Sequence, residues 1–157
     1  MKKIEITAYE LAQRFVGQVF ERAGVQDHPL IQWWLSLCGY GLDSHDEVPW
    51  CSAFCQGPTY ELRLPRSKSA AARSWLTVGI PVPLDRAEVG FDVVILKRGG
   101  PGQPGPDVIA APGHVGFFGG HEAAAGRLLV LGGNQGDAVT LGSFRTDDLL
   151  GVRRLFG

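Results

Sequence analysis

The chain has 157 residues with a formal net charge of −1, and 45% of its residues are hydrophobic. This length suits one domain with a hydrophobic core, so we expect a single domain over residues 1–157. The near-neutral charge gives no strong attraction to nucleic acid or to anionic lipid, and we expect neither as a partner. The N-terminal segment carries Glu5, Glu10 and Gln13 where a secretory signal would be apolar, so we expect synthesis in the cytoplasm.

Helical periodicity dominates the first part of the chain. Residues 7–24 have apolar side chains at helical spacing, with Thr7 as the expected N-cap and Gly24 as the expected stop. Residues 29–38 are predicted to form a second helix. Pro29 stands at its first position, where the missing N–H of proline costs nothing.

A third helix is predicted to begin at Cys51, after a polar, glycine-bearing loop. Gly57 and Pro58 then occupy positions that should be helix interior, where a proline costs about 3 kcal/mol. We therefore expect this helix to be short or kinked. A fourth helix is predicted over residues 69–78.

The periodicity changes in the second part of the chain. Short apolar or β-branched segments, mostly bounded by glycine, predict strands at 90–99, 113–120, 126–134, 137–144 and 149–157. Helices followed by strands predict an α+β fold, with the N-terminal helices packed on a C-terminal antiparallel sheet in meander order. The Gly/Pro-rich loop 99–113 should be ordered by turns.

Cys51 is a candidate nucleophile because of its place at a predicted helix start. Unpaired N–H groups and the helix dipole favour an anion there, so the thiol tends toward thiolate. The alternative is a buried cysteine that only packs. The chain has three cysteines, Cys38, Cys51 and Cys55, which are too few for a disulfide framework, and the odd number leaves at least one thiol free. No CxxC or HxxxH spacing predicts zinc.

His114 is the strongest of four histidines as a partner for the thiol. It opens a predicted strand directly after Gly113, although a strand histidine is often only a hydrogen-bonded structural residue. His45 lies six positions before Cys51 and could neighbour the site. His28 and His121 are expected at a helix entry and a hairpin tip.

Asn134 is the third member of the candidate set. It ends an apolar predicted strand, where a neutral amide could orient the imidazole, and where asparagine also simply forms turns. The chain order of cysteine, histidine and asparagine is the order of papain-like enzymes.

Five blocks of the sequence resemble the CHAP superfamily of cysteine, histidine-dependent amidohydrolases/peptidases: "DEVPWCSAF", "SAAARSWL", "GFDVVILKRG", "GHVGFF" and "LGGNQGDAV". The chain is most similar to compact single-domain members common in phages and prophages, over about Leu11 to Arg154. The resemblance implies a papain-like fold and hydrolysis of amide bonds in bacterial peptidoglycan. It implies Cys51 as nucleophile, His114 as general base and Asn134 as the orienting residue.

The sequence departs from the usual pattern of that family. The family's nucleophile helix usually runs on past the cysteine without interruption, whereas Gly57 and Pro58 follow Cys51 here. Many members carry a glutamate two residues before the asparagine, where this chain has Gly132. Some relatives bind Ca²⁺ ahead of the cysteine. The three carboxylates there, Asp43, Asp46 and Glu47, lack the alternating spacing of a calcium loop and favour a solvated turn. We therefore expect no metal and no cofactor, with Ca²⁺ at these carboxylates as the less favoured alternative.

Trp50, Trp75 and His45 are candidates for lining the substrate groove, although aromatic residues beside a nucleophile helix more often pack in the core. Loop 99–113 could form one wall. The expected partners are peptidoglycan peptides at the cell wall, and the sequence names no delivery or immunity partner. Three alternatives remain: an acyltransferase or transglutaminase-like enzyme, a catalytically inactive phage tail or assembly protein, and an amidase toxin delivered by a secretion system.

Overall fold

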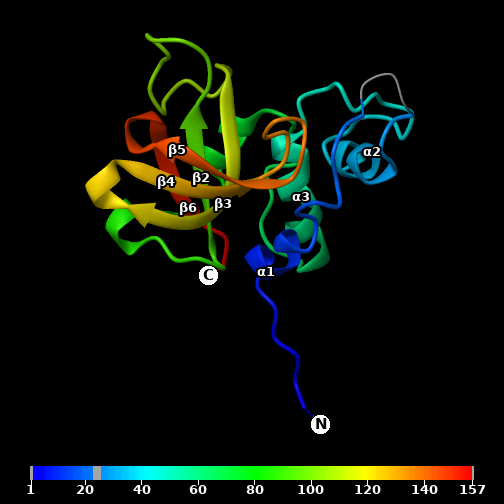
Figure 1. Ribbon diagram of the computed structural model, residues 1–157, viewed down its shortest axis with the longest axis horizontal. Coiled ribbons are helices and arrows are strands. Elements are labelled where there is room, and N and C mark those ends of the chain that lie inside the picture. The colour runs from blue at the N-terminus through cyan, green and yellow to red at the C-terminus, as the bar shows by residue number, and fades with distance from the viewer. Residues whose placement is uncertain (1, 23–25, 157) are drawn as a thin grey trace.

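The structure is a computed structural model of the 157-residue chain, and it describes residues 2–22 and 26–156. Within these ranges, three α-helices occupy the N-terminal part and an antiparallel sheet of six strands occupies the C-terminal part (Figure 1). The predicted α+β class is confirmed. None of the helices in these ranges has the length and apolarity needed to cross a membrane.

Helix α1 (Ala8–Gln13) begins at the predicted cap. The Thr7 hydroxyl accepts a hydrogen bond from the Glu10 backbone N–H, and the Glu10 carboxylate accepts one from the Thr7 N–H. The helix is shorter than predicted. Turns follow it, and Gly17 takes a left-handed φ of 73° that ends the helical geometry. The expected stop at Gly24 lies outside the described residues.

Helix α2 (Pro29–Ser36) begins at the predicted proline. The ring of His28 caps it, because its Nδ1 accepts a hydrogen bond of 3.2 Å from the backbone N–H of Leu30. Its buried face packs against α3 through Ile31, Trp34 and Leu35.

Helix α3 (Cys51–Glu61) begins at Cys51 as predicted, but it is not ended at Gly57 or Pro58. Its residues from Cys51 to Thr59 are all buried, and a Cβ atom on Gly57 would overlap the indole ring of Trp34. Glycine therefore lets α2 and α3 pack closely. This tertiary packing holds the helix together through the proline, which would end an isolated helix.

The fourth predicted helix is a 3₁₀ helix, η1 (Ala72–Thr77), instead of an α-helix. Two side-chain hydroxyls within it donate to backbone carbonyls three residues earlier, Ser74 to Ala71 and Thr77 to Ser74. Such bonds compete with the backbone pattern of an α-helix.

The strands are β1 (Ile80–Val82), β2 (Asp92–Lys97), β3 (Gly113–Glu122), β4 (Arg127–Gly132), β5 (Thr140–Arg145) and β6 (Leu149–Arg154). Their order is β1-β6-β2-β3-β4-β5, so the predicted meander holds for β2 to β5. The last strand breaks it by returning to the far side of β2. Strand β1 was not predicted, because Pro81 interrupts a short segment; an edge strand tolerates that proline.

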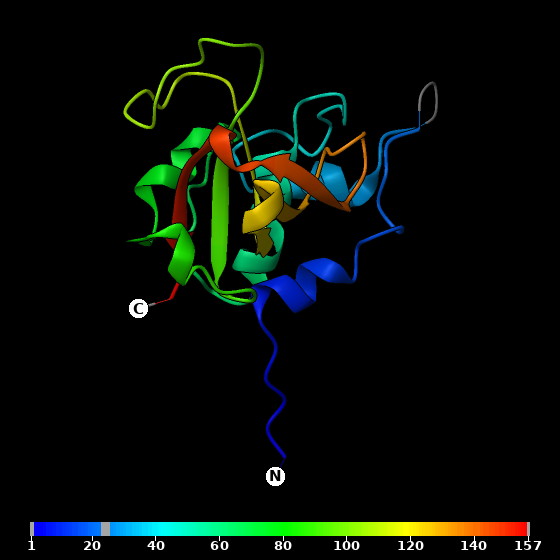
Figure 2. The same cartoon turned by 60° about the vertical axis from the view of Figure 1, so that its left-hand side comes forward.

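The strand side chains alternate between two hydrophobic clusters. One face of the sheet meets the helices through Val93, Ile95, Val115, Phe117 and Leu131. The opposite face forms a smaller cluster with Val94, Leu96, Phe118, Leu128 and Val130. Figures 1 and 2 show α1 to α3 on one side of the sheet, as predicted, with α3 packed on β3 and β4.

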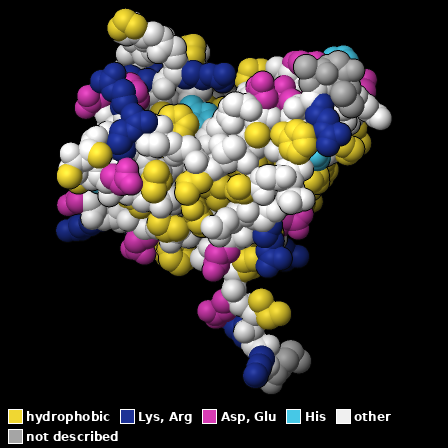
Figure 3. Space-filling view, viewed as in Figure 1, with side chains coloured by type: hydrophobic (Ala, Val, Ile, Leu, Met, Phe, Trp, Pro, Cys, Tyr) yellow, Lys and Arg dark blue, Asp and Glu magenta, His cyan; other side chains and the backbone are white. Residues whose placement is uncertain are grey.

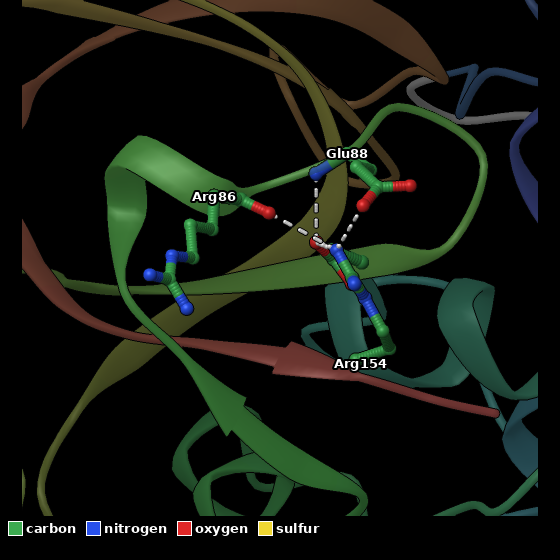
Figure 4. Close-up of polar contacts among 4 residues, drawn as sticks. Arg86, Glu88 and Arg154 are labelled. Atoms are coloured by element: carbon green, nitrogen blue, oxygen red, sulfur yellow. Dashed lines mark hydrogen bonds and ion pairs between the residues drawn. The ribbon is translucent and has the colours of Figure 1, made fainter. Parts of the chain in front are cut away.

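A buried ion pair joins β2 to β6 at the start of β2. The Arg154 guanidinium donates to both carboxylate oxygens of Asp92, at 2.8 and 2.9 Å, and the Asp92 side chain is fully buried. Figure 4 shows Arg154 also reaching the Arg86 carbonyl oxygen and the Glu88 carboxylate. Because β2 and β3 are antiparallel, this network lies at the end of the sheet opposite to His114.

Candidate active site

Cys51 stands at the N-terminus of α3, and only 2% of its surface is exposed. The N-cap residue of this helix is Trp50, whose side chain does not accept a hydrogen bond from the first backbone N–H groups of the helix. Burial raises the pKa of the Cys51 thiol. The backbone N–H of Val115 and the charge of Arg98 partly oppose that effect. The predicted thiolate is therefore not favoured in the resting protein, since burial outweighs the helix terminus.

His114 opens β3 and is 6% exposed. It directly precedes Val115, whose backbone N–H is close enough to the Cys51 thiol to lower the pKa of that thiol, so the predicted nucleophile and base lie in neighbouring parts of the fold. Its ring stacks on Phe144 with centroids 5.2 Å apart. Burial lowers the pKa of His114, which leaves the imidazole neutral and able to accept a proton.

The side chain that holds this ring is Gln135. Its Oε1 lies 2.8 Å from Nε2 of His114, and its Nε2 donates to the Thr140 carbonyl at 2.8 Å and to the Val130 carbonyl at 3.2 Å. Because carbonyl oxygens only accept, these anchors fix which end of the amide faces the ring. The ring nitrogen Nε2 therefore carries a proton, and Nδ1 is left as the basic atom.

Asn134 does not take the orienting position that the sequence indicated. Its φ of 54° is left-handed, so the chain turns there, and the following residue, Gln135, returns to the histidine. Asn134 instead contributes to the wall of the cavity around His114. Asn134 and Gln135 both carry a side-chain amide, and the sequence alone does not indicate which one faces the ring. The turn at Asn134 decides it.

The glycines before this turn make room for it. A Cβ atom on Gly132 would overlap the Gln135 carboxamide and lie 3.2 Å from Nε2 of His114. A side chain at position 132, where many members of the CHAP superfamily have glutamate, would occupy the same space beside the ring. A Cβ atom on Gly133 would overlap Trp50 and Phe54, so the turn also packs directly on α3.

The two tryptophans that were candidates for the groove are core residues, which is the more common place for aromatic residues beside such a helix. Trp50 is fully buried and donates its indole N–H to the carboxylate of Glu21. Trp75 is also fully buried and donates to the Ser52 hydroxyl at 2.8 Å. Their indole groups lie among the helices because burying such large apolar rings stabilises the fold. Neither lines a cavity beside Cys51 or His114.

Two open cavities lie beside the candidate residues. One, of about 540 Å³, is lined by Cys51, Arg98 and small residues of segments 70–72 and 110–113. The other, of about 370 Å³, is lined by His114, Gln135, Lys97 and Arg98, with Asn134, Gly136, Thr140 and Phe144. Loop 99–113 contributes to the first cavity, as expected. A substrate would therefore have room beside Cys51 and beside His114, and Arg98 lines both cavities.

Loop 99–113 is held by Arg73, which sequence reasoning missed. This arginine, in η1, is fully buried, and its guanidinium donates to four backbone carbonyls at 2.8 to 3.1 Å, those of Pro104, Gly105, Val108 and Pro112. Four acceptors from one loop fix the course of the chain into Gly113 and His114. The partners lie 31 to 39 residues away, so no local pattern indicated them.

His45 lies away from the groove residues, in the only acidic group of the described chain that could hold a metal ion. Ligand atoms of Asp27, His45 and Glu47 lie within 4.8 Å of one another. Of the three carboxylates considered for calcium, Glu47 alone is in this group, and Asp46 accepts the backbone N–H of His28. His45 pairs with Asp27 at 3.2 Å and lines neither cavity.

No family model matches the chain, and no curated protein or solved structure matches it. The resemblance to the CHAP superfamily therefore stays a prediction. Function is inferred from the chemistry of Cys51, His114 and Gln135 and from the cavities around them.

Proposed function

We propose that the protein is a papain-like cysteine amidase or endopeptidase that hydrolyses an amide bond in bacterial peptidoglycan peptides. The observation that carries the proposal is the fixed orientation of His114. Its Nε2 is held by Gln135, which leaves Nδ1 as a neutral base, and the next residue, Val115, has its backbone N–H close enough to lower the pKa of the Cys51 thiol. The substrate class comes from the sequence resemblance, and on this proposal the enzyme acts at the cell wall.

Attack begins from a neutral pair. Nδ1 of His114 takes the proton of the Cys51 thiol while the sulfur bonds to the amide carbon, and the carbonyl electron pair moves onto oxygen. The oxyanion accepts hydrogen bonds at the start of α3, where the backbone N–H of Cys51 has no capping side chain. The Gln135 carbonyl oxygen stabilises the imidazolium that forms.

Breakdown releases the two halves of the substrate in turn. The carbon–nitrogen bond breaks, and the imidazolium of His114 gives its Nδ1 proton to the departing amine, leaving a thioester on Cys51. The neutral imidazole then takes a proton from water, which attacks the thioester carbon. The carbon–sulfur bond breaks, the thiol recovers its proton, and a carboxylic acid leaves.

The test is digestion of purified peptidoglycan, with the soluble fragments identified by mass spectrometry. Wild type and a Cys38→Ala control should release the same fragments, and Cys51→Ala should release none, with all three folded by circular dichroism. Fragment masses would identify the cleaved amide. Release by Cys51→Ala would exclude Cys51 as nucleophile. No release by folded wild type would contradict the proposed function.

A further inference from the structure

Arg98 is the residue that the two cavities share. It follows the last residue of β2, is exposed, and lines the cavity beside Cys51 as well as the one beside His114. Lys97 lines the second cavity with it. Among the described residues, no aspartate or glutamate lines either cavity. The charged side chains that line the two cavities are therefore all positive, apart from the titratable Cys51 and His114.

This positive charge is not neutralised from within the described residues. The ion pairs found there use Lys3, His45, Arg145 and Arg154, and none uses Lys97 or Arg98. Figure 3 shows Lys and Arg side chains over the edge of the sheet below loop 99–113, with Asp or Glu side chains among them and a histidine side chain visible beside them. A pair of unpartnered cations at the mouth of a cavity attracts and orients an anionic group of a ligand.

We propose that Lys97 and Arg98 form a subsite for a carboxylate of the substrate, on the half that departs as the amine. This inference rests on the proposed function. His114 must protonate the departing amine, so that half of the substrate lies over the cavity beside His114. Both cations line that cavity, whereas the one beside Cys51 has Arg98 alone. The preferred substrate then has a free carboxylate on the amine side of the cleaved bond.

The subsite is tested with a matched pair of peptidoglycan stem peptides. One has a free carboxylate on the amine side of the cleaved bond, and the other has a carboxamide there. In wild type, amidation should lower kcat/KM about tenfold, mostly through KM, as expected for losing a hydrogen bond between charged groups. In Arg98→Gln, the two peptides should be cleaved at nearly equal rates, and Lys97→Gln should weaken the preference.

Two controls keep the result specific. The ratio between the two peptides cancels any effect of Arg98 on the titration of Cys51 or His114, because both peptides share it. Arg14→Gln removes the same charge from an exposed residue that lines neither cavity, and should keep the wild-type ratio. Arg98→Lys keeps the charge and should keep part of the preference.

Binding to the inactive Cys51→Ala variant, measured by calorimetry with the same two peptides, separates the subsite from the proposed function. Tighter binding of the carboxylate form, lost in Cys51→Ala/Arg98→Gln, supports the subsite even if wild type cleaves neither peptide, an outcome that would contradict the proposed function alone. Equal binding of the two forms overturns the subsite. A preference set by a carboxylate on the acyl half overturns its placement.

Discussion

The carboxamide of Gln135 and the ring of His114 are joined by a hydrogen bond of 2.8 Å between Oε1 and Nε2. The other end of the amide is anchored on the carbonyls of Val130 and Thr140, so it cannot rotate without losing both bonds. This arrangement selects one imidazole tautomer, the one whose Nδ1 is basic. The absence of a side chain on Gly132 leaves the space that the carboxamide occupies.

Gln135→Ala should therefore lower kcat about tenfold to a hundredfold, less than the 10²–10⁴ that a general base itself supplies. The loss through His114 should appear in kcat, and any change in KM reports the place of Gln135 in the cavity wall. Gln135→Glu should move the acidic limb of the kcat/KM profile to higher pH, since a carboxylate stabilises the imidazolium. Kinetics on a defined stem peptide would measure both effects.

Asn134→Gly is the matched control for this prediction. Glycine suits the left-handed φ of 54°, so the variant removes the neighbouring carboxamide without backbone strain. The kcat should stay within about twofold of wild type, because the hydrogen bond between Gln135 and His114 is kept, whereas KM reports the change in the cavity wall. If Asn134→Gly lost as much kcat as Gln135→Ala, the orienting role would belong to the turn as a whole.

The burial of His114 predicts a pH-dependent stability. Its folded-state pKa is lowered from 6.5 by burial, so the unfolded chain takes up the proton first as the pH falls. From pH 6.5 down to the lower folded-state pKa, the unfolded state binds more protons, and the free energy of unfolding decreases with acidification. The slope from this group is at most about 1.4 kcal/mol per pH unit.

Urea unfolding of wild type and His114→Gln, measured in parallel over this pH range, would check the effect. Glutamine cannot take up a proton there, so the variant should lose stability less steeply than wild type below pH 6.5. Parallel curves for the two proteins would mean that His114 titrates alike in the folded and unfolded states.

The raised pKa of Cys51 predicts a thiol that reacts slowly at neutral pH. Burial is the largest cause, and it moves the pKa above the ordinary value of 9.0. In a Cys38→Ser/Cys55→Ala background, the rate of alkylation by iodoacetamide should keep rising beyond pH 9.0, as the thiolate forms. A rate that levelled off below neutral pH would instead indicate a preformed thiolate–imidazolium pair, and would contradict the neutral starting state.

Local signals in the sequence gave the starts of the helices. Thr7 with Glu10 formed the expected capping box, Pro29 opened α2, and α3 began at Cys51. These features depend on neighbouring residues alone, and local chemistry decides them. The five expected strands were found for the same reason, since alternation and bounding glycines are local patterns.

Features set by distant contacts were missed. Which of two adjacent amides meets His114 depends on the turn at Asn134. The persistence of α3 through Pro58 likewise depends on burial against α2 and the sheet. Tertiary packing overrides local propensity in each case.

Arg73 supplies the last prediction, because it links the core to the loop that leads into His114. Arg73→Met keeps a long apolar stem against Gly113 but removes the donors to four carbonyls. The free energy of unfolding should fall by about 2–3 kcal/mol, since the hydrogen bonds of a buried guanidinium are lost. Trypsin should cut faster after Arg98, at the start of the loop, and kcat/KM should fall because His114 is less well placed.

Arg86→Met is the control for Arg73→Met, because Arg86 is exposed and contributes its backbone carbonyl to the contacts of Arg154. Urea unfolding, limited proteolysis and peptide kinetics on both variants would distinguish two roles for Arg73. Faster cleavage together with lower activity would mean that Arg73 positions the loop and, through Gly113, the candidate base. Reduced stability with unchanged cleavage and activity would confine Arg73 to the core, and loop 99–113 would then be ordered by its own turns.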